Sequence, residues 1–286
     1  MHTCLRPGDV EGAGVCKDAI RIFRGKKVAL NSDIARTNVL GVGISAVNMP
    51  MAVEVVHQWI AGGERHYVCV AAAHSVMECR RDAPLRRLFN QSGLTTPDGM
   101  PLVWLSRWAG HRDVRRVYGP ELMSAVCLRG LEHGYRHYFY GGAPGVAEGL
   151  VDRLRARFPD LAVAGSSSPV YRDLKREEEE RIEREINDAH PDIVWVGLGT
   201  GRQEHWMARV RPRLQASVLV GVGAAFDFLS GQKRQAPPWI RQTGLEWLFR
   251  LVHEPRRLWP RYREYPLFVL LVAAQRLNLR SYDLDP

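Results

Sequence analysis

The sequence predicts an α/β protein, with a Rossmann-like parallel sheet flanked by helices and a basic helical appendage at the C-terminus. Short apolar runs alternate with longer amphipathic stretches, as expected for strands joined by helical crossovers. Most of these runs end in glycine, which lets the backbone approach a ligand at the carboxyl ends of the strands. Residues 241–280 hold eight arginines against three acidic residues, a bias that sets this end of the chain apart.

Four apolar runs are interpreted as buried strands, and three amphipathic stretches as the helices beside them. The strands are expected at residues 67–73, 136–140, 193–198 and 218–222. The helices are expected at residues 75–90, 146–158 and 174–189. The last of these helices has a charged face that i,i+4 ion pairs can hold in solvent.

The chain of 286 residues can bury one large core or two modest ones. We expect a loosely ordered leader at residues 1–36, an α/β core at 37–240 and a basic amphipathic appendage at 241–286. The five cysteines form no Cys-x-x-Cys pair, which favours reduced thiols in the cytoplasm over a disulfide framework. The apolar run at 266–274 has nine residues, whereas a transmembrane helix needs about 20. We therefore expect a cytoplasmic protein that associates with a membrane peripherally, if at all.

The net charge of +9 points to an anionic partner. More than half of the surplus positive charge lies in residues 241–280. Such a basic end attracts phosphates, whether they belong to a nucleotide, an anionic lipid or a nucleic acid, and charge alone does not choose among them.

Glycines at the expected strand ends are candidates for contact with a nucleotide. Gly141 and Gly142 lie between a strand and a helix whose free N–H groups could face an anion, although a tight turn that binds nothing explains them equally well. Gly221 and Gly223 end another strand. A third glycine-rich end, at residues 197–201 (GLGTG), lacks the last glycine of a dinucleotide fingerprint, and the chain has no Walker A sequence.

Three further side chains stand beside these glycine-rich ends. Gln203 opens a helix, where its amide could hydrogen-bond a base or a sugar. Glu204 follows it, although an acid in a first helical turn often only compensates the helix dipole. Asp227 is an isolated acid in the loop after the last strand.

Asp98 is the sharpest catalytic candidate. It lies in a Pro-Asp-Gly sequence between apolar segments, which could also be a simple turn. Arg116 follows in a second polar island. An acid that takes a proton and a cation that holds a departing phosphate are what transfer from a nucleotide-activated donor requires.

Metal-binding signals are weak, because Gly134 interrupts the pair of His133 and His137. We therefore expect neither a metal nor a cofactor.

Four blocks in register resemble the WecG/TagA/CpsF glycosyltransferases (glycosyltransferase family 26), over roughly residues 40–263. The blocks are Pro97-Asp98-Gly99 with Arg116-Val117-Tyr118-Gly119; Tyr140-Gly141-Gly142-Ala143-Pro144-Gly145; residues 191–199 (PDIVWVGLG) leading to Gln203-Glu204; and residues 221–227 (GVGAAFD) through Ala236-Pro237-Pro238-Trp239, Gly244-Leu245-Glu246-Trp247 and Glu254-Pro255-Arg256-Arg257-Leu258.

The resemblance implies an inverting, metal-independent enzyme of surface or exported polysaccharide synthesis. It would move a sugar, N-acetylmannosamine in the best-known members, from a UDP donor to a polyprenyl-diphosphate-linked acceptor. It implies that Asp98 is the base and that Arg116 is an active-site contact. The donor would meet Gln203. The other residues expected to bind the donor are Gly141, Gly142, Glu204, Gly221, Gly223 and Asp227.

The resemblance also assigns a role to the basic appendage, which would dock on the inner face of the cell membrane and help to close the active site. Arg256, Arg257 and Arg261 would meet phosphates there. The partners implied are a UDP-sugar, the lipid-linked acceptor and an anionic membrane surface rather than nucleic acid. The sequence does not determine the oligomeric state, and a homo-oligomer is one of the possibilities.

The chain departs from the family pattern at two places. Many members carry Thr and Asn where this chain has Val70 and Ala72, and the nearby His74 could take over a polar role. The usual Pro-Lys before Gln-Glu is Gly201-Arg202 here. The donor sugar is therefore open. A different class, a non-catalytic module that binds a nucleotide or anionic lipid, would explain the basic tail but would leave Asp98 without a purpose.

Overall fold

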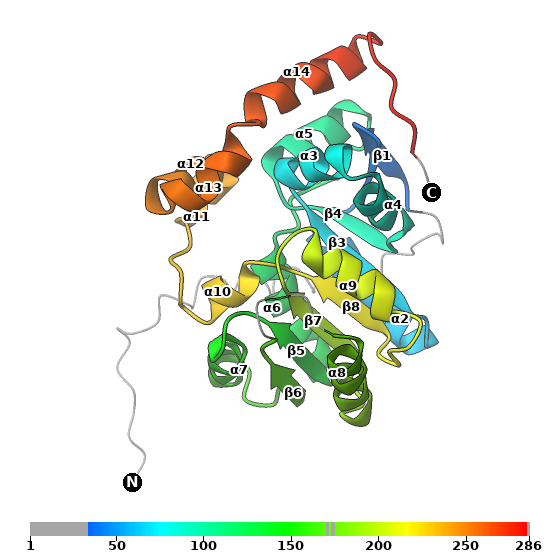
Figure 1. Cartoon of the computed structure of the whole chain (residues 1–286), viewed down its shortest axis with the longest axis vertical. Helices are drawn as coiled ribbons and strands as arrows, with labels where there is room; N and C mark the ends of the chain where they lie inside the picture. The colour runs from blue at the N-terminus through cyan, green and yellow to red at the C-terminus, as the bar shows by residue number, and fades with distance from the viewer. Residues whose placement is uncertain (1–33, 170–171, 173–174, 285–286) are drawn as a thin grey trace.

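The computed structural model describes residues 34–169, 172 and 175–284, and its centre is a parallel sheet (Figure 1). Six strands lie in the order β4-β3-β8-β7-β5-β6, and every neighbouring pair is parallel, which confirms the predicted fold class. The strands are β3 (His66–Ala71), β4 (Leu94–Pro97), β5 (His137–Gly141), β6 (Val163–Ser167), β7 (Ile193–Gly197) and β8 (Val218–Gly221). All six carboxyl ends therefore meet at one edge, where ligands bind in open parallel sheets.

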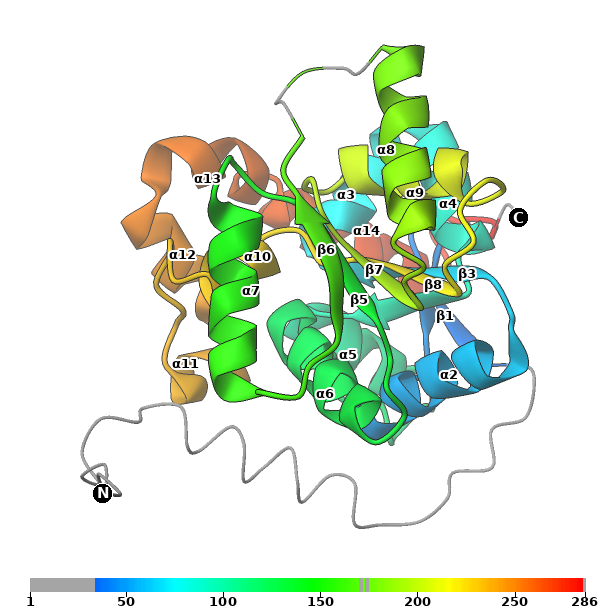
Figure 2. The same ribbon diagram turned by 90° about the horizontal axis from the view of Figure 1, so that it is seen from below.

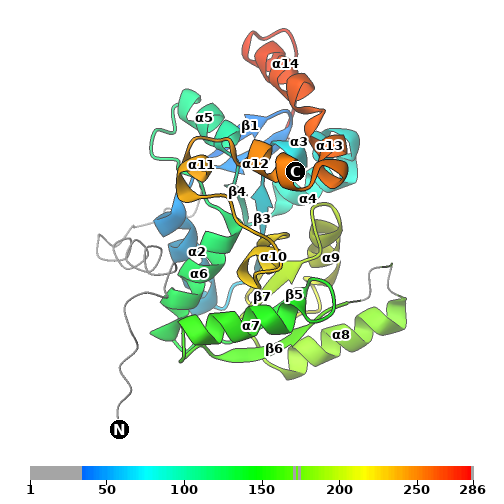
Figure 3. The ribbon, with the colours of Figure 1, turned by 90° about the vertical axis from the view of Figure 1, so that its left-hand side faces the viewer.

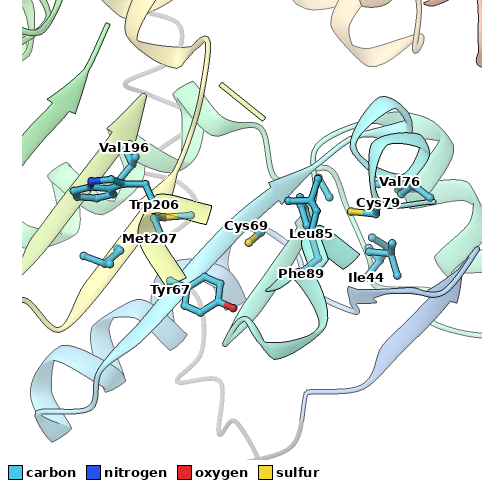
Figure 4. Close-up of a cluster of buried hydrophobic side chains, with 14 of the residues drawn as sticks. Ile44, Tyr67, Cys69, Val76, Cys79, Leu85, Phe89, Val196, Trp206 and Met207 are labelled. Carbon is cyan, nitrogen blue, oxygen red and sulfur yellow. The ribbon is translucent and has the colours of Figure 1, made fainter. Parts of the chain in front are cut away.

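Helices cover both faces of the sheet, so the core has two halves (Figure 2). Alternate strand residues enter opposite halves: Tyr138 and Tyr140 join one cluster, and Phe139 between them joins the other. The first half is completed by α3 (Ala73–Arg81), α4 (Ala83–Gln91), α8 (Arg176–Asp188) and α9 (Arg202–Val210), and the second by α2 (Met49–Gly62), α6 (Gly119–Leu131), α7 (Val146–Arg157) and α10 (Ala225–Leu229). Figure 4 shows part of the first half, with Trp206 and Met207 on α9.

A short antiparallel hairpin of β1 (Arg36–Val39) and β2 (Val42–Ser45) packs beside β4 and α4. Its turn places Leu40 and Gly41 at positive φ, 52° and 89°. Leucine is unusual at such an angle, and the C-terminal part of the chain supports it: the Leu40 N–H donates to Gln275 Oε1 at 3.0 Å. The start and the end of the described chain are thus tied together.

Four C-terminal helices form the basic appendage (Figures 1 and 3). They are α11 (Pro238–Gln242), α12 (Glu246–His253), α13 (Pro255–Tyr262) and α14 (Tyr265–Arg276). The appendage is anchored by Phe268 and Leu271, which α14 contributes to the core beside α3. No helix in the described ranges is both long and apolar enough to span a bilayer.

The single helix predicted at residues 75–90 is wrong, because the chain forms two helices that meet at Asp82. The Asp82 carboxylate accepts the Leu85 N–H at 2.9 Å and so caps α4. Pro84 then lies in the first turn of α4, where its missing N–H costs little.

Two strands of the sheet and the hairpin were not predicted. β4 reads LTTP, too short and too polar to stand out, and β6 is a half-buried edge strand that reads VAGSS. The first strand of the described residues begins at Arg36, within the expected leader, and the Arg36 side chain donates to the Asn90 carbonyl at 2.8 Å. The rest of the leader, residues 1–33, lies outside the described residues.

Candidate active site

Asp98 and Arg116 reach the carboxyl edge of the sheet by separate routes. Asp98 directly follows β4, and its N–H donates to the carbonyl of Ala71 at the end of β3 (2.8 Å). Arg116 precedes α6, and the N–H of its neighbour Val117 donates to the Pro97 carbonyl at 2.8 Å. These two backbone hydrogen bonds fix the acid and the cation against the same pair of strand ends.

The two side chains form an ion pair that a residue of α12 extends. Arg116 Nη2 donates to Asp98 Oδ1 at 3.0 Å and to Glu246 Oε2 at 2.6 Å. Arg116 Nε also donates to the Asp98 backbone carbonyl, and the guanidinium lies 4.3 Å from the centre of the Tyr118 ring. The three charged side chains are only 11–23% exposed, so solvent screens their interactions weakly.

This environment makes the Asp98 carboxylate more basic than an ordinary aspartate. Burial raises the pKa of Asp98 to about 6, with the Glu246 carboxylate adding to the rise and the Arg116 guanidinium opposing it. For Arg116, burial alone would lower the pKa, but the carboxylates of Asp98 and Glu246 outweigh it and raise the pKa above its ordinary value. A carboxylate with a pKa near 6 is a stronger base than an ordinary aspartate and is still ionised at neutral pH.

A cavity of about 70 Å³ opens beside Asp98, between the core and the appendage. The core contributes His74 and Met100, among others, and the appendage contributes the rest of the wall: Arg241, Gly244, Glu246, Trp247, Arg250, Tyr262 and Tyr265. A larger cavity, of about 590 Å³, lies between β1 and the end of α14, but it contains neither Asp98 nor Arg116. We therefore place the candidate site at the smaller cavity, which is lined by both Asp98 and Arg116.

Arg250 is the cation in this wall that lacks a carboxylate partner within the described residues. Its guanidinium lies 5.3 Å from the centre of the Phe228 ring, and its Nε is buried without a hydrogen-bond partner. Its neighbour Arg241, by contrast, donates to Glu121 at 2.5 Å. Arg250 is therefore the arginine of the cavity best placed to accept an anionic group from a ligand.

The glycines at the strand ends lie close to the neighbouring backbone and side chains. A Cβ on Gly141 would come within 2.6 Å of the Gly197 backbone, and Gly142 has a φ of 76°. A Cβ on Gly221 would approach Met207 and Gln203 within 3.0 Å, and Gly223 has a φ of 51°. Packing and backbone conformation thus account for these four glycines, whether or not a donor also lies against them.

Gln203 and Glu204 are bonded within the protein. Gln203 is 2% exposed; its Oε1 accepts the Gly223 N–H at 3.0 Å, and its Nε2 donates to Glu204 Oε1 at 2.8 Å. Glu204 is fully buried and accepts the Gly201 N–H at 2.6 Å, which caps α9. Burial raises the pKa of Glu204 to about 7, although its hydrogen bonds to Gln203 and Gly201 oppose this. The pair fixes the glycine-rich ends of β7 and β8 relative to each other.

The remaining candidates lie farther from Asp98 or have partners of their own. Asp227 pairs with Lys233 (Oδ2–Nζ 2.8 Å). Arg257 pairs with Glu254, whereas Arg256 is exposed. Arg261 Nη2 lies 3.6 Å from Glu78 Oε1 on α3. The structure thus brings Arg116 to Asp98 but does not bring Arg256 or Arg257 into the wall of the cavity.

His74 lines the cavity at the start of α3. Its Nε2 lies 3.3 Å from Thr200 Oγ1, in the loop after β7. Burial lowers the pKa of His74 well below its ordinary value, and the positive charges of Arg261 and Arg250 lower it further. His74 is therefore neutral at pH 7 and provides a polar group in the wall, next to Ala72.

Two groups of this site, Glu246 and Arg250, were not predicted from the sequence. Glu246 is the one acid between Asp227 and Glu254, a signal that could have singled it out within a basic segment. Its contact with Arg116 spans 130 positions, which no local pattern reveals. Among the described residues, no three His, Cys, Asp or Glu side chains gather as they would around a metal ion.

Open parallel α/β sheets bind ligands at the carboxyl ends of their strands, which is where this structure places a buried acid–arginine pair. A sequence model described as "Glycosyl transferase WecG/TagA/CpsF family" matches residues 37–282. The chain belongs to this glycosyltransferase family.

Two relatives of the chain carry the name N-acetylglucosaminyldiphosphoundecaprenol N-acetyl-beta-D-mannosaminyltransferase. The one from Bacillus subtilis (strain 168) is 28% identical over 199 residues, which cover 70% of this chain and 75% of the relative. The one from Staphylococcus aureus (strain MW2) is 26% identical over 253 residues, which cover 87% of this chain and 97% of the relative.

Substitution of Glu204 tests the electrostatics at the edge of the sheet. The pKa of this buried carboxyl is raised from 4.5 to about 7. Between these two pH values the folded state therefore still holds a proton that the unfolded state has already released. The free energy of unfolding should therefore fall with rising pH more steeply in the wild type than in Glu204→Gln, by on the order of 1–3 kcal/mol between pH 4.5 and 7.5. Urea unfolding across this range measures it, and parallel curves for the two proteins would contradict the assignment.

Proposed function

We propose that this protein is an inverting, metal-independent glycosyltransferase. It would transfer an N-acetylmannosamine-type sugar or a related hexose from a UDP donor to a polyprenyl-diphosphate-linked acceptor, in the synthesis of a surface or exported polysaccharide. The observation that carries the proposal is the buried Asp98–Arg116 pair in the wall of the cavity. The names of the two relatives support the acceptor class, since both act on a sugar linked to diphosphoundecaprenol.

In the proposed reaction, Asp98 acts as the general base. Its carboxylate takes the proton of the acceptor hydroxyl while that oxygen attacks the anomeric carbon of the donor sugar. The bond from the anomeric carbon to the diphosphate breaks, and its electron pair leaves with UDP. Attack from the face opposite UDP inverts the configuration. A pKa near 6 suits this role, because Asp98 is ionised at pH 7 and is still basic enough to share the proton in the transition state.

Arginines are proposed to stabilise the charge that develops on the departing diphosphate. Arg250 lines the cavity without a carboxylate partner in the described part of the chain, and Arg116 lies across from it beside Asp98. Fixed cations of this kind can supply the stabilisation for which other transferases use a divalent ion. Arg261, near Glu78, is proposed as a further phosphate contact at the mouth of the site.

The donor side is proposed to lie along the glycine-rich ends of β5, β7 and β8, which neighbour each other in the sheet. Gln203 and Glu204 would hold these ends in place, so their contribution to donor binding would come mainly through Gly223 and Gly201. The donor sugar of the relatives is N-acetylmannosamine. Val70 and Ala72, with His74 nearby, replace the polar pair common in the family, so a related hexose is an equally good candidate here.

A membrane surface is the proposed location, with residues 241–286 as the docking appendage. Within the described residues, every large apolar side chain that is strongly exposed lies on α5 (Met100–Trp108) or at residue 239 and beyond. They include Trp108 (73% exposed) on α5 and Leu270 (68% exposed) on α14. Exposed Arg256 lies in the same appendage. Apolar and aromatic side chains among arginines are typical of a face that binds the interface of an anionic bilayer.

Asp98→Asn tests the base. Asparagine keeps the shape but cannot accept a proton, so turnover should fall by about 10²–10⁴-fold, with the KM for the donor within about threefold of wild type. The matched control is Asp192→Asn, at the amino end of β7, where the side chain accepts the Arg136 N–H at 2.8 Å. Steady-state kinetics with a UDP-sugar and a lipid-diphosphate acceptor measure both. Near-normal turnover in Asp98→Asn would remove Asp98 from this role.

Arg250→Ala tests the phosphate contact. A charge-assisted hydrogen bond lost in the transition state contributes about 1.5–3 kcal/mol, so kcat/KM should fall about 10- to 100-fold. Arg263→Ala is the control, because it removes an exposed arginine from the same appendage. Equal effects of the two substitutions would show that Arg250 acts only through the general charge of the appendage.

Leu270→Asp tests the membrane face. A buried carboxylate at the bilayer interface is unfavourable, so binding to vesicles that contain phosphatidylglycerol should fall at least tenfold in co-sedimentation. Gln58→Asp adds the same charge at an exposed position on α2 and should leave binding unchanged. If Leu270→Asp still binds as the wild type does, α14 is not the docking element.

A non-catalytic module that binds nucleotide or anionic lipid is the second candidate, favoured by the exposed apolar and basic surface alone. It gives no purpose to the buried Asp98–Arg116 pair. Folded, vesicle-bound protein that releases no UDP with any donor would favour it over the enzyme.

A further inference from the structure

The Arg116 guanidinium that pairs with Asp98 also receives a carboxylate from the appendage. The side chain of Glu246, the first residue of α12, is 11% exposed, and its Oε2 accepts from Arg116 Nη2 at 2.6 Å. The same nitrogen donates to Asp98 Oδ1 at 3.0 Å. One nitrogen atom is therefore shared by a residue at the end of β4 and a residue of the C-terminal appendage.

We propose that Glu246 is a positioning residue for the transfer reaction, which couples docking of the C-terminal helices to the strength of Asp98 as a base. This inference rests on the proposed function, in which Asp98 is that base. Glu246 acts through Arg116: it draws part of the guanidinium's charge away from Asp98 and holds the guanidinium in place over the Tyr118 ring.

The other ion pairs between the appendage and the core differ from this one. Arg81 pairs with Glu264 but is 53% exposed, and Glu121, the partner of Arg241, is 43% exposed. Exposed pairs of this kind contribute little to stability and are screened by solvent. The Arg116–Glu246 pair is 17% and 11% exposed. Of the pairs the described residues form between the two parts, it is the one whose core partner also contacts Asp98.

The charges around Asp98 determine the sign of the effect. Arg116 and Tyr118 face it from the segment before α6, Glu246 and Arg250 from α12, and Tyr265 from α14. The rest of the cavity wall that can carry charge is His74, Arg241 and Tyr262. With Glu246 present, Arg116 is shared between two carboxylates, and the like charge of Glu246 makes the ionised form of Asp98 less favourable. Without that charge, Arg116 pairs with Asp98 alone, and Asp98 becomes a weaker base.

Glu246→Gln removes the charge and keeps the shape, so the titration of Asp98 should move to lower pH by about half a unit or more. Carbon-13 NMR of aspartate carboxyls in the full-length protein without substrates measures this, with Asp98→Asn to assign the signal. Glu264→Gln is the matched control: it breaks the pair between α14 and Arg81 and should leave the titration unchanged. An unchanged titration in Glu246→Gln, or an equal shift in Glu264→Gln, would overturn the inference.

Kinetics then separate this inference from the function on which it rests. In Glu246→Gln the acid limb of kcat/KM, measured with UDP-N-acetylmannosamine and a lipid-diphosphate acceptor, should move in the same direction, and kcat at pH 7 should fall about two- to threefold, as expected for a base weaker by about half a pKa unit. Glu246→Asp, which restores the charge, should return the limb toward its wild-type position. If the acid limb does not move although the wild type is active, Glu246 has no positioning role. If the wild type releases no UDP with any donor while the NMR shift is present, the proposed function fails but the coupling of Glu246 to Asp98 stands.

Discussion

The buried guanidinium of Arg116 is the interaction on which the candidate site depends. A charge in this position is unfavourable unless partners compensate it, and here two carboxylates and the face of Tyr118 do so. The partners come from the end of β4, from the segment before α6 and from α12. The core alone therefore does not complete the site. Glu246 compensates part of the charge of Arg116, so the electrostatic environment of Asp98 depends on the position of the appendage.

The sheet sets the other constraint, which is distance. Asp98 follows the edge strand β4, whereas the glycine-rich ends belong to β8, β7 and β5, two or more places away in the order. Neighbouring strands lie about 4.8 Å apart, so a donor held along the glycines would reach Asp98 only by extending across the end of β3. His74 and Ala72 lie there, in the wall of the cavity. Among the places where the chain departs from the family pattern, Ala72 and the neighbouring His74 therefore lie where the sugar of the donor would lie, which is why they bear on its identity.

The sequence predicted the parts of the structure that local patterns encode. β3, β5, β7 and β8 are runs of buried apolar residues, and each was predicted to within about two residues. β4 could not be found this way, because it is short and polar, and the buried Thr95 is held by hydrogen bonds to the nearby Phe89 carbonyl and to Ser45, 50 positions away. Asp98 and Arg116 stood out as polar islands in apolar surroundings. Glu246 did not, because its partner lies 130 positions away and tertiary contact alone gives it a role.

The measurement that tests the central claim most directly is UDP release from a panel of UDP-sugars, with N-acetylglucosaminyl-diphosphoundecaprenol as acceptor and EDTA present. Release with one donor, dependent on the acceptor and lost in Asp98→Asn, is the predicted result. It would identify the sugar and show that the reaction requires no divalent ion, as expected if arginines stabilise the departing diphosphate. No release with any donor from folded protein bound to vesicles would contradict the proposed function. Release that requires added Mg²⁺ would contradict the part assigned to the arginines.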